Sequence, residues 1–273
     1  MNPRSRLPET ERFALTVVVA TNLLPLAGVV GFGWRVGSLL AVYWIEVAVL
    51  VLAHSAAAMF AERPIVLEGR SFYITGYDED AERDEVWETD AEPVHLVSWL
   101  PPIYRRNFRV VRRSLGVFAF MMFPLLAVGW EALSYLTPTV GVATLGVCGA
   151  QVGEVRREFF AERAYEDQSP YMVVEAAQRV VFFYFVVAIL TVVSVTFGIA
   201  VIDVVLAPGL LDGVADAVLL VPYLLPIALG KATVEWSRRR AFQEDDPDGI
   251  ATWFTGEDAR RDWKKDEESV GDA

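Results

Sequence analysis

Apolar residues in this chain gather in six long blocks rather than alternating with polar ones. The blocks cover approximately residues 13–34, 36–60, 115–136, 137–155, 180–202 and 215–236. A helix needs roughly 20 residues to cross the ~30 Å hydrocarbon core of a bilayer, and most of the blocks reach that length. The pattern therefore predicts an all-α fold: a polytopic, multi-pass protein of the cell membrane with six transmembrane helices.

The block at 137–155 is the weakest of the six, because it is rich in glycine. Its Gly149 and Gly153 have GxxxG spacing, and Gly146 extends the run of small residues. Without side chains, helix backbones can approach closely at such positions. We therefore expect Gly146, Gly149 and Gly153 to form a helix-packing face.

Arginine and lysine positions predict the orientation, because these residues flank the cytoplasmic ends of membrane spans. If all six blocks cross and the N-terminus is inside, all of the 24 basic residues except Arg35 lie on the cytoplasmic side. If 137–155 did not cross, more than half of them would face outward. The charge pattern thus favours six crossings with cytoplasmic N- and C-termini.

The net charge of −12 is concentrated in two stretches, residues 78–92 and 243–273. We expect a six-helix domain over 1–242 with an acidic cytoplasmic loop at 61–113, and a disordered acidic tail at 243–273. An acidic composition with far more arginine than lysine is typical of salt-adapted proteins. The bilayer is the expected partner and no nucleic acid is expected, whereas a homo-oligomer or a protein partner on the loop stays open.

Two stretches of the loop, 64–77 and 95–107, mix aromatic and aliphatic residues with arginine. Segments that lie at the headgroup boundary of a membrane have this composition. Pro101 and Pro102 prevent the second stretch from forming one continuous helix. We expect the loop to dock on the lipid surface.

One carboxylate, Glu46, lies near the middle of the second block. An acid at the centre of a membrane helix costs about 2.5–3.5 kcal/mol on insertion scales, so it should face other helices and have a partner. Asn22 falls at a similar depth in the first block, which runs the opposite way. His54 lies two turns nearer the cytoplasm, and Lys231 would supply a counter-charge if the sixth helix packs beside the second.

Two interpretations of Asn22, Glu46, His54 and Lys231 stay open. In the first, the four residues form an intramembrane site for a proton or a cation. In the second, Glu46 is protonated or hydrogen-bonded to Asn22 and holds the second helix against the first. Intramembrane hydrogen bonds of this kind contribute about 0.6–2 kcal/mol.

Three further charged residues are expected to form structural pairs near the inner edge of the membrane. Glu175 with Arg179, and Lys231 with Glu235, have the i,i+4 spacing at which opposite charges meet on one helix face. Long side chains at a membrane boundary reach water at little cost. We therefore expect Glu175, Arg179 and Glu235 to support the fold.

Sequence signatures of common enzymes are missing from the chain. It has no HExxH, GxSxG, P-loop or GxGxxG element. Its single cysteine, Cys148, excludes an intramolecular disulfide and any Cys-based metal cluster. No catalytic residue, metal site or cofactor is predicted.

Several elements of the membrane part form a pattern of their own: Asn22 with Pro25, then Gly28 and Trp34, "LLAVYWIE" (39–46) and "LLPIALGKATVEW" (224–236). This pattern resembles an uncharacterised prokaryotic family of multi-spanning membrane proteins that is well represented in haloarchaea. The Tyr-Trp-x-Glu element is its most distinctive part. The resemblance implies an integral membrane fold and no known activity.

The leading hypothesis is a transport or permeation protein for a proton, an ion or a small solute, with Glu46 at its centre. The first alternative is a non-catalytic membrane scaffold whose cytoplasmic loop binds a partner. The second is an intramembrane enzyme. Replacing Glu46 separates the transport hypothesis from the scaffold hypothesis. Deleting residues 78–92 tests the scaffold hypothesis.

Overall fold

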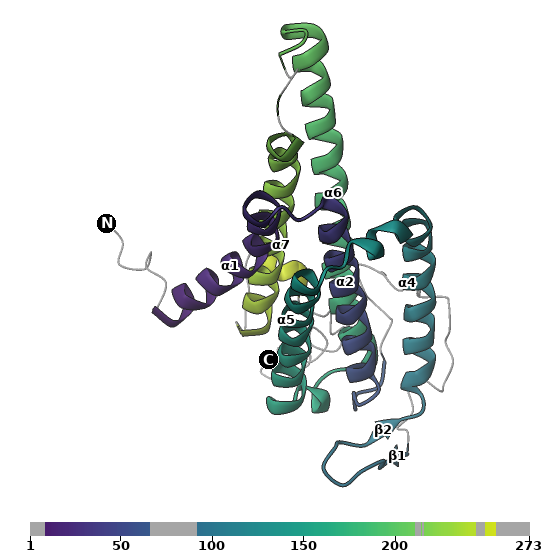
Figure 1. Ribbon diagram of the computed structural model, residues 1–273. Coiled ribbons are helices and arrows are strands. Elements are labelled where there is room, and N and C mark those ends of the chain that lie inside the picture. The colour runs from purple at the N-terminus through teal and green to yellow at the C-terminus, as the bar shows by residue number, and fades with distance from the viewer. Residues whose placement is uncertain (1–8, 66–91, 211–213, 215, 244–248, 255–273) are drawn as a thin grey trace, which may run out of the picture. The chain divides into compact units, whose positions relative to one another are not determined.

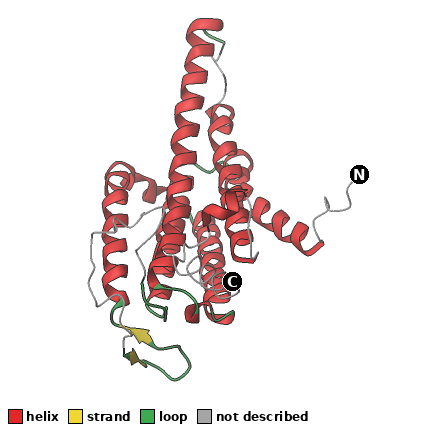
Figure 2. Ribbon diagram, turned by 180° about the vertical axis from the view of Figure 1, so that it is seen from behind, coloured by secondary structure: helices red, strands yellow, loops and turns green. Residues whose placement is uncertain are grey.

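The computed structural model describes residues 9–65, 92–210, 214, 216–243 and 249–254, and nearly all of this structure is helical (Figure 1, Figure 2). Each of the six apolar blocks forms a helix. The helices are α1 (Glu9–Phe32), α2 (Val36–Ala58), α4 (Asn107–Gly129), α5 (Pro138–Val155), α6 (Pro170–Ala200) and α7 (Asp216–Gln243).

Three helical stretches among the described residues are long and apolar enough to cross a membrane. They are Gly37–Ala58, Pro170–Val205 and Val218–Ala241, and a shorter apolar stretch covers Val18–Phe32. Side chains on the second half of α6 are widely exposed, Phe197 at 71% and Val193 at 62% among them, as lipid-facing residues would be. These helices indicate a membrane protein, while the six crossings and the orientation of the termini stay predictions.

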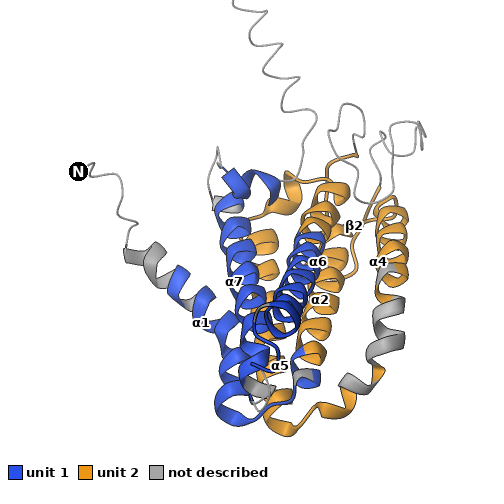
Figure 3. Ribbon diagram, turned by 90° about the horizontal axis from the view of Figure 1, so that it is seen from above, with its two compact units in different colours: residues 1–39, 180–254 blue, residues 40–179, 255–273 orange. Residues whose placement is uncertain are grey.

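The chain forms two compact units (Figure 3). Unit 1 comprises Met1–Leu39 and Val180–Phe254, and unit 2 comprises Leu40–Arg179 and Thr255–Ala273. The acidic segment predicted at 78–92 lies almost entirely outside the described residues, as does most of the predicted disordered tail.

In unit 1, α1 packs against α7, with Val29, Leu39 and Leu224 in a small apolar core. The helices α6 and α7 approach closely at Gly230, where an added Cβ would lie 2.5 Å from a methyl carbon of Val187. Within the tail for which disorder is predicted, Gly249–Phe254 forms a short 3-10 helix, and Phe254 is buried against Phe183.

The core of unit 2 joins the end of α2, the start of α4, the end of α5 and the start of α6. Its largest fully buried side chain is Tyr171, and Phe159 contributes to an aromatic cluster at the end of α5. A π-helical segment, Arg156–Ala161, follows α5 directly. At its other end α5 begins with Pro138 after Thr137, whose hydroxyl accepts a hydrogen bond from the Val140 N–H and so caps the helix.

The end of α2 is held by residues that come more than 40 positions later. The side-chain amide of Asn107, the first residue of α4, donates to the carbonyls of Ala58, Met59 and Ala61 at 2.9, 3.3 and 2.8 Å. The Arg106 guanidinium donates to the Glu62 carbonyl. Because the last carbonyls of a helix have no partner within it, these bonds complete α2.

Between α2 and α4, a short hairpin occupies part of the segment expected at the lipid surface. Pro93–Val94 (β1) pairs antiparallel with Ile103–Tyr104 (β2). The residues between the strands expose apolar side chains, with Leu96 at 64% and Trp99 at 79%. Exposed leucine and tryptophan on a loop are typical of a surface that rests at the headgroup level.

Candidate functional site

Glu46 is buried near the middle of α2, with 3% of its surface exposed. It lies within the membrane-length stretch Gly37–Ala58, nine residues from its start and twelve from its end. The carboxyl group is near enough to the thiol of Cys148 on α5 to act on it electrostatically. Glu46 therefore lies in the protein interior, as expected for an ionisable group in an apolar helix.

His54 is also buried on α2, eight residues after Glu46. Eight residues along a helix correspond to about 12 Å along its axis. The Nδ1 atom of His54 lies 2.9 Å from the carbonyl oxygen of Leu50. Because a carbonyl can only accept, Nδ1 carries the hydrogen, and Nε2 is the nitrogen at which the ring takes up or releases a proton.

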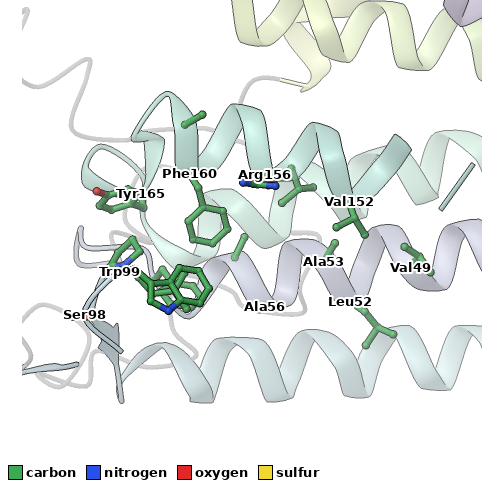
Figure 4. A pocket seen from close by; sticks show the side chains of 16 residues that line it. Val49, Leu52, Ala53, Ala56, Ser98, Trp99, Val152, Arg156, Phe160 and Tyr165 are labelled. Carbon is green, nitrogen blue, oxygen red and sulfur yellow. The ribbon is translucent and has the colours of Figure 1, made fainter. Parts of the chain in front are cut away.

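Gln151 on α5 adds a polar group that the sequence analysis did not select. It is 7% exposed, and its side-chain oxygen has no hydrogen-bond partner among the described residues. The helices α2 and α5 run in the same direction here, with Val49 and Val152 at the same end (Figure 4). Together with the approach of Glu46 to Cys148, this register places Gln151 at a level between Glu46 and His54.

Unit 2 thus contains polar groups at several levels along α2 and α5. We call these residues the α2–α5 polar set: Glu46, His54, Cys148 and Gln151. A carboxyl, an imidazole and a vacant amide oxygen can accept and release protons or hold water molecules. The only sequence signal for Gln151 is a polar residue within a weakly apolar block.

A second polar cluster lies in unit 1 and involves three of the residues selected from the sequence. The side-chain amide of Asn22 donates to one oxygen of Glu235 at 2.7 Å, and the Tyr184 hydroxyl donates to the other at 3.3 Å. The Lys231 ammonium lies 5.2 Å from the centre of the Tyr184 ring. We call Asn22, Tyr184, Lys231 and Glu235 the unit 1 network.

The predicted hydrogen bond between Asn22 and Glu46 stays a prediction, because the two residues belong to different units. The amide nitrogen of Asn22 donates to the Val18 carbonyl at 2.9 Å as well as to Glu235. These bonds use both of its hydrogens. A bond to Glu46 would have to be donated by a protonated Glu46 to the Asn22 oxygen.

The predicted pair between Glu175 and Arg179 is present and is buried in unit 2. Their side chains approach to 2.5 Å, and the exposed fractions are 0% and 8%. One turn away, Gln178 donates to the Ser114 hydroxyl at 2.8 Å and so links α6 to α4. The first turns of α6 are therefore a polar part of the protein core.

The glycine face predicted on α5 has no neighbour within the described part of the chain. A Cβ added at Gly146, Gly149 or Gly153 would have no atom of the described residues within 4 Å, apart from its own helix backbone and chain neighbours. The buried side of α5 is formed instead by Val140, Thr144, Gln151 and Val155. Packing of another helix on the glycines stays a prediction.

Two residues of the sequence pattern that indicated a family, Gly28 and Trp34, contact each other. Gly33 ends α1 with φ +65°, and the Trp34 N–H then donates to the Gly28 carbonyl at 3.0 Å. The indole ring folds over Gly28, where an added Cβ would lie 2.3 Å from a ring carbon. Only glycine fits at this position beneath the ring.

Comparison with known proteins identifies one relationship. Residues 4–221 match a family of unknown function, DUF6498. The match covers most of the chain, including α1 to α6 and the first part of α7. No curated protein and no solved structure matches the chain.

Proposed function

The chain belongs to DUF6498, a family of unknown function, and from its own residues we propose that it is a multi-pass membrane protein that transports protons, alone or with a small solute. The α2–α5 polar set would form the route, with Glu46 as the central protonation site. One observation carries the proposal: Glu46 is buried near the middle of a membrane-length helix, within electrostatic range of α5, which bears the buried polar groups Thr144 and Gln151.

Gln151 supports a route rather than an isolated acid. A relay needs groups that exchange protons or hold water between the central carboxyl and the membrane surface. The oxygen of Gln151 has no hydrogen-bond partner among the described residues, and the parallel course of α2 and α5 would put it between the levels of Glu46 and His54. A water bound at Gln151 would shorten the gap of about 12 Å between the carboxyl and the imidazole.

Glu235 has a different role in this proposal. Both of its oxygens accept hydrogen bonds, from Asn22 on α1 and from Tyr184 on α6. A carboxylate that joins three helices in this way stabilises their packing. We therefore propose that the unit 1 network is structural and that Glu235 is a suitable control for Glu46.

Proton flux into proteoliposomes that contain the full-length protein tests the proposal. A pH-sensitive dye inside the vesicles reports acidification of the lumen after the pH of the external buffer is lowered. We expect Glu46→Gln to reduce the flux to that of empty vesicles and Glu46→Asp to retain part of it, because only the second variant keeps a titratable group. Glu235→Gln should transport as the wild type does after correction for the amount of folded protein.

Flux through Glu46→Gln at the wild-type rate would refute the role of Glu46. Absence of flux in the wild type, with a co-purifying protein that is lost when residues 78–92 are deleted, would favour a membrane scaffold instead. Thermal unfolding in detergent must first show that each variant is folded.

A further inference from the structure

Unit 2 contains a large groove between α2, the π-helical segment after α5 and the hairpin segment 98–101. Its volume is about 1170 Å³, and sixteen residues line it (Figure 4). Pockets that enclose small organic ligands measure about 300–1,000 Å³, so the groove has room for a ligand larger than a typical metabolite.

The groove is apolar at one end and polar at the other. Val49 and Leu52 of α2 and Val152 of α5 line the apolar end, which lies within the predicted membrane spans. Arg156 stands near the middle of the groove, and Tyr165 and Trp99 stand at the other end, beyond Phe160 (Figure 4). These three side chains can all donate hydrogen bonds, and none of the lining residues is acidic.

Arg156 is the one charged residue in the lining. None of the hydrogen bonds and ion pairs found among the described residues involves its guanidinium group, whereas the adjacent Arg157 pairs with Glu158 at 3.2 Å. Arg156 is also the first residue of the π-helical segment, a rare backbone form that often occurs at functional sites. A cation in this position that has no partner among the described residues is complementary to an anionic group of a ligand.

The face of α5 that bears Val152 and Arg156 also bears two glycines. Gly149 and Gly153 share a helix face with Val152 and Arg156, because residues three, four and seven positions apart lie on one side of a helix. A Cβ added at either glycine would meet no other part of the described chain within 4 Å. The same face therefore combines open space with an available positive charge.

We propose that this groove binds an anionic phospholipid of the cytoplasmic leaflet. The phosphate group pairs with Arg156, Trp99 and Tyr165 lie at the level of the headgroup, and an acyl chain follows the apolar wall of Val49, Leu52 and Val152. The exposed Leu96 and Trp99 hold the hairpin at the membrane surface beside the headgroup. This proposal does not depend on proton transport.

Lipid binding to the purified full-length protein in detergent tests the proposal. We would titrate phosphatidylglycerol and phosphatidylcholine of equal chain length, and measure the unfolding temperature together with bound lipid by native mass spectrometry. We expect phosphatidylglycerol to bind more tightly and to raise the unfolding temperature more. Arg156→Gln should weaken phosphatidylglycerol binding about tenfold, as expected for the loss of a charge-assisted hydrogen bond.

Arg157→Gln is the matched control, since it removes a neighbouring arginine that does not line the groove. The Arg157→Gln protein should bind both lipids as the wild type does. Ala56→Trp fills the groove from an exposed position of α2, so the protein should fold while binding of both lipids is lost. The unfolding temperature without lipid checks the folding of each variant.

Three results would overturn the proposal. The first is equal binding of the two lipids by the wild type, which indicates bulk lipid around the helices. The second is an equal loss with Arg156→Gln and Arg157→Gln, which indicates general surface charge. The third is the same stabilisation by glycerol phosphate, which indicates a headgroup site without an acyl chain.

Discussion

At the scale of single residues, the carboxylate of Glu235 connects three helices of unit 1. It accepts hydrogen bonds from residues of α1 and α6, and it lies itself on α7. Asn22 is 213 positions away in the chain. No local pattern could predict that contact, because it depends on which helices become neighbours.

The pair between Glu175 and Arg179 shows the opposite case. Both residues belong to one helix, so the i,i+4 spacing was enough to predict their contact, and the structure confirms it. The burial of the pair did not follow from the spacing. It results from the packing of α2, α4 and α5 around the first turns of α6.

Gly28→Ala should destabilise unit 1 by about 1–3 kcal/mol, since the new methyl group would overlap the Trp34 ring. Gly31→Ala is the matched control. Gly31 lies one turn later on α1, and an added Cβ would meet no atom of the described residues within 4 Å outside its own helix, so the change should be neutral or stabilising by about 0.5–1 kcal/mol. Thermal unfolding in detergent measures both. Equal stabilities of the two variants would contradict the close contact of ring and glycine.

At the scale of secondary structure, the apolar blocks predicted where helices occur better than where they end. The block at 137–155 coincides with α5 to within one residue, but α7 continues seven residues beyond the predicted end at 236, and α6 begins at Pro170 rather than at 180. Glu175, Gln178 and Arg179 interrupt the apolar pattern just before the block, which is why hydropathy alone excludes them. Their burial in polar pairs allows the helix to continue.

The three hydrogen bonds from Asn107 to the end of α2 lead to a prediction about element stability. Asn107→Ala should lower the free energy of unfolding by about 1–3 kcal/mol, because three carbonyls lose the Asn107 donor and, among the described residues, only those of Ala58 and Met59 keep a backbone N–H donor. Asn107→Asp has nearly the same shape but no N–H donor, so it should destabilise at least as much. A change below about 0.5 kcal/mol in both variants, measured by denaturant unfolding, would show that other groups cap α2.

Tyr104 of β2 makes the stability of the hairpin region dependent on alkaline pH. Burial raises the pKa of its phenol above the ordinary value of 10.0, and the carboxylate of Glu62, which accepts a hydrogen bond from the hydroxyl, raises the pKa further. The folded protein therefore holds this proton more tightly than the unfolded chain does. The resulting stabilisation is complete below pH 10 and is lost as the pH rises through the folded-state pKa.

Unfolding temperatures measured from pH 8 to pH 11 should thus fall more steeply for the wild type than for Tyr104→Phe, which has no phenol to ionise. Comparison of the two proteins removes the contribution of the other tyrosines and lysines, which titrate in the same range. Parallel curves would contradict the raised pKa.

The membrane topology is the main question at the scale of the whole molecule. With six crossings, the turn before α5 faces outward, whereas it stays inside if α4 and α5 fail to cross as a pair. A single cysteine at Thr139, an exposed residue in the first turn of α5, distinguishes these cases in a Cys148→Ser background.

We expect Thr139→Cys in intact cells to react with a membrane-impermeant thiol reagent, as Leu210→Cys should, while Glu162→Cys reacts only after the cells are opened. Thr139 comes after α4, Leu210 comes after α6, and Glu162 comes after α5. Labelling of Leu210→Cys without Thr139→Cys would show that α4 and α5 do not cross.

The hydrogen bonds from Arg106 and Asn107 back to residues 58–62 also determine how the segment between α2 and α4 can be used in the laboratory. The folded protein holds the two ends of this segment together, so the segment is a loop with fixed ends. Doubling the length of such a loop raises the free-energy cost of closing it by only about 0.6 kcal/mol. A fluorescent protein or an affinity tag inserted between residues 78 and 92 should therefore leave both helices in place. The chain has an attachment point there that is independent of its termini.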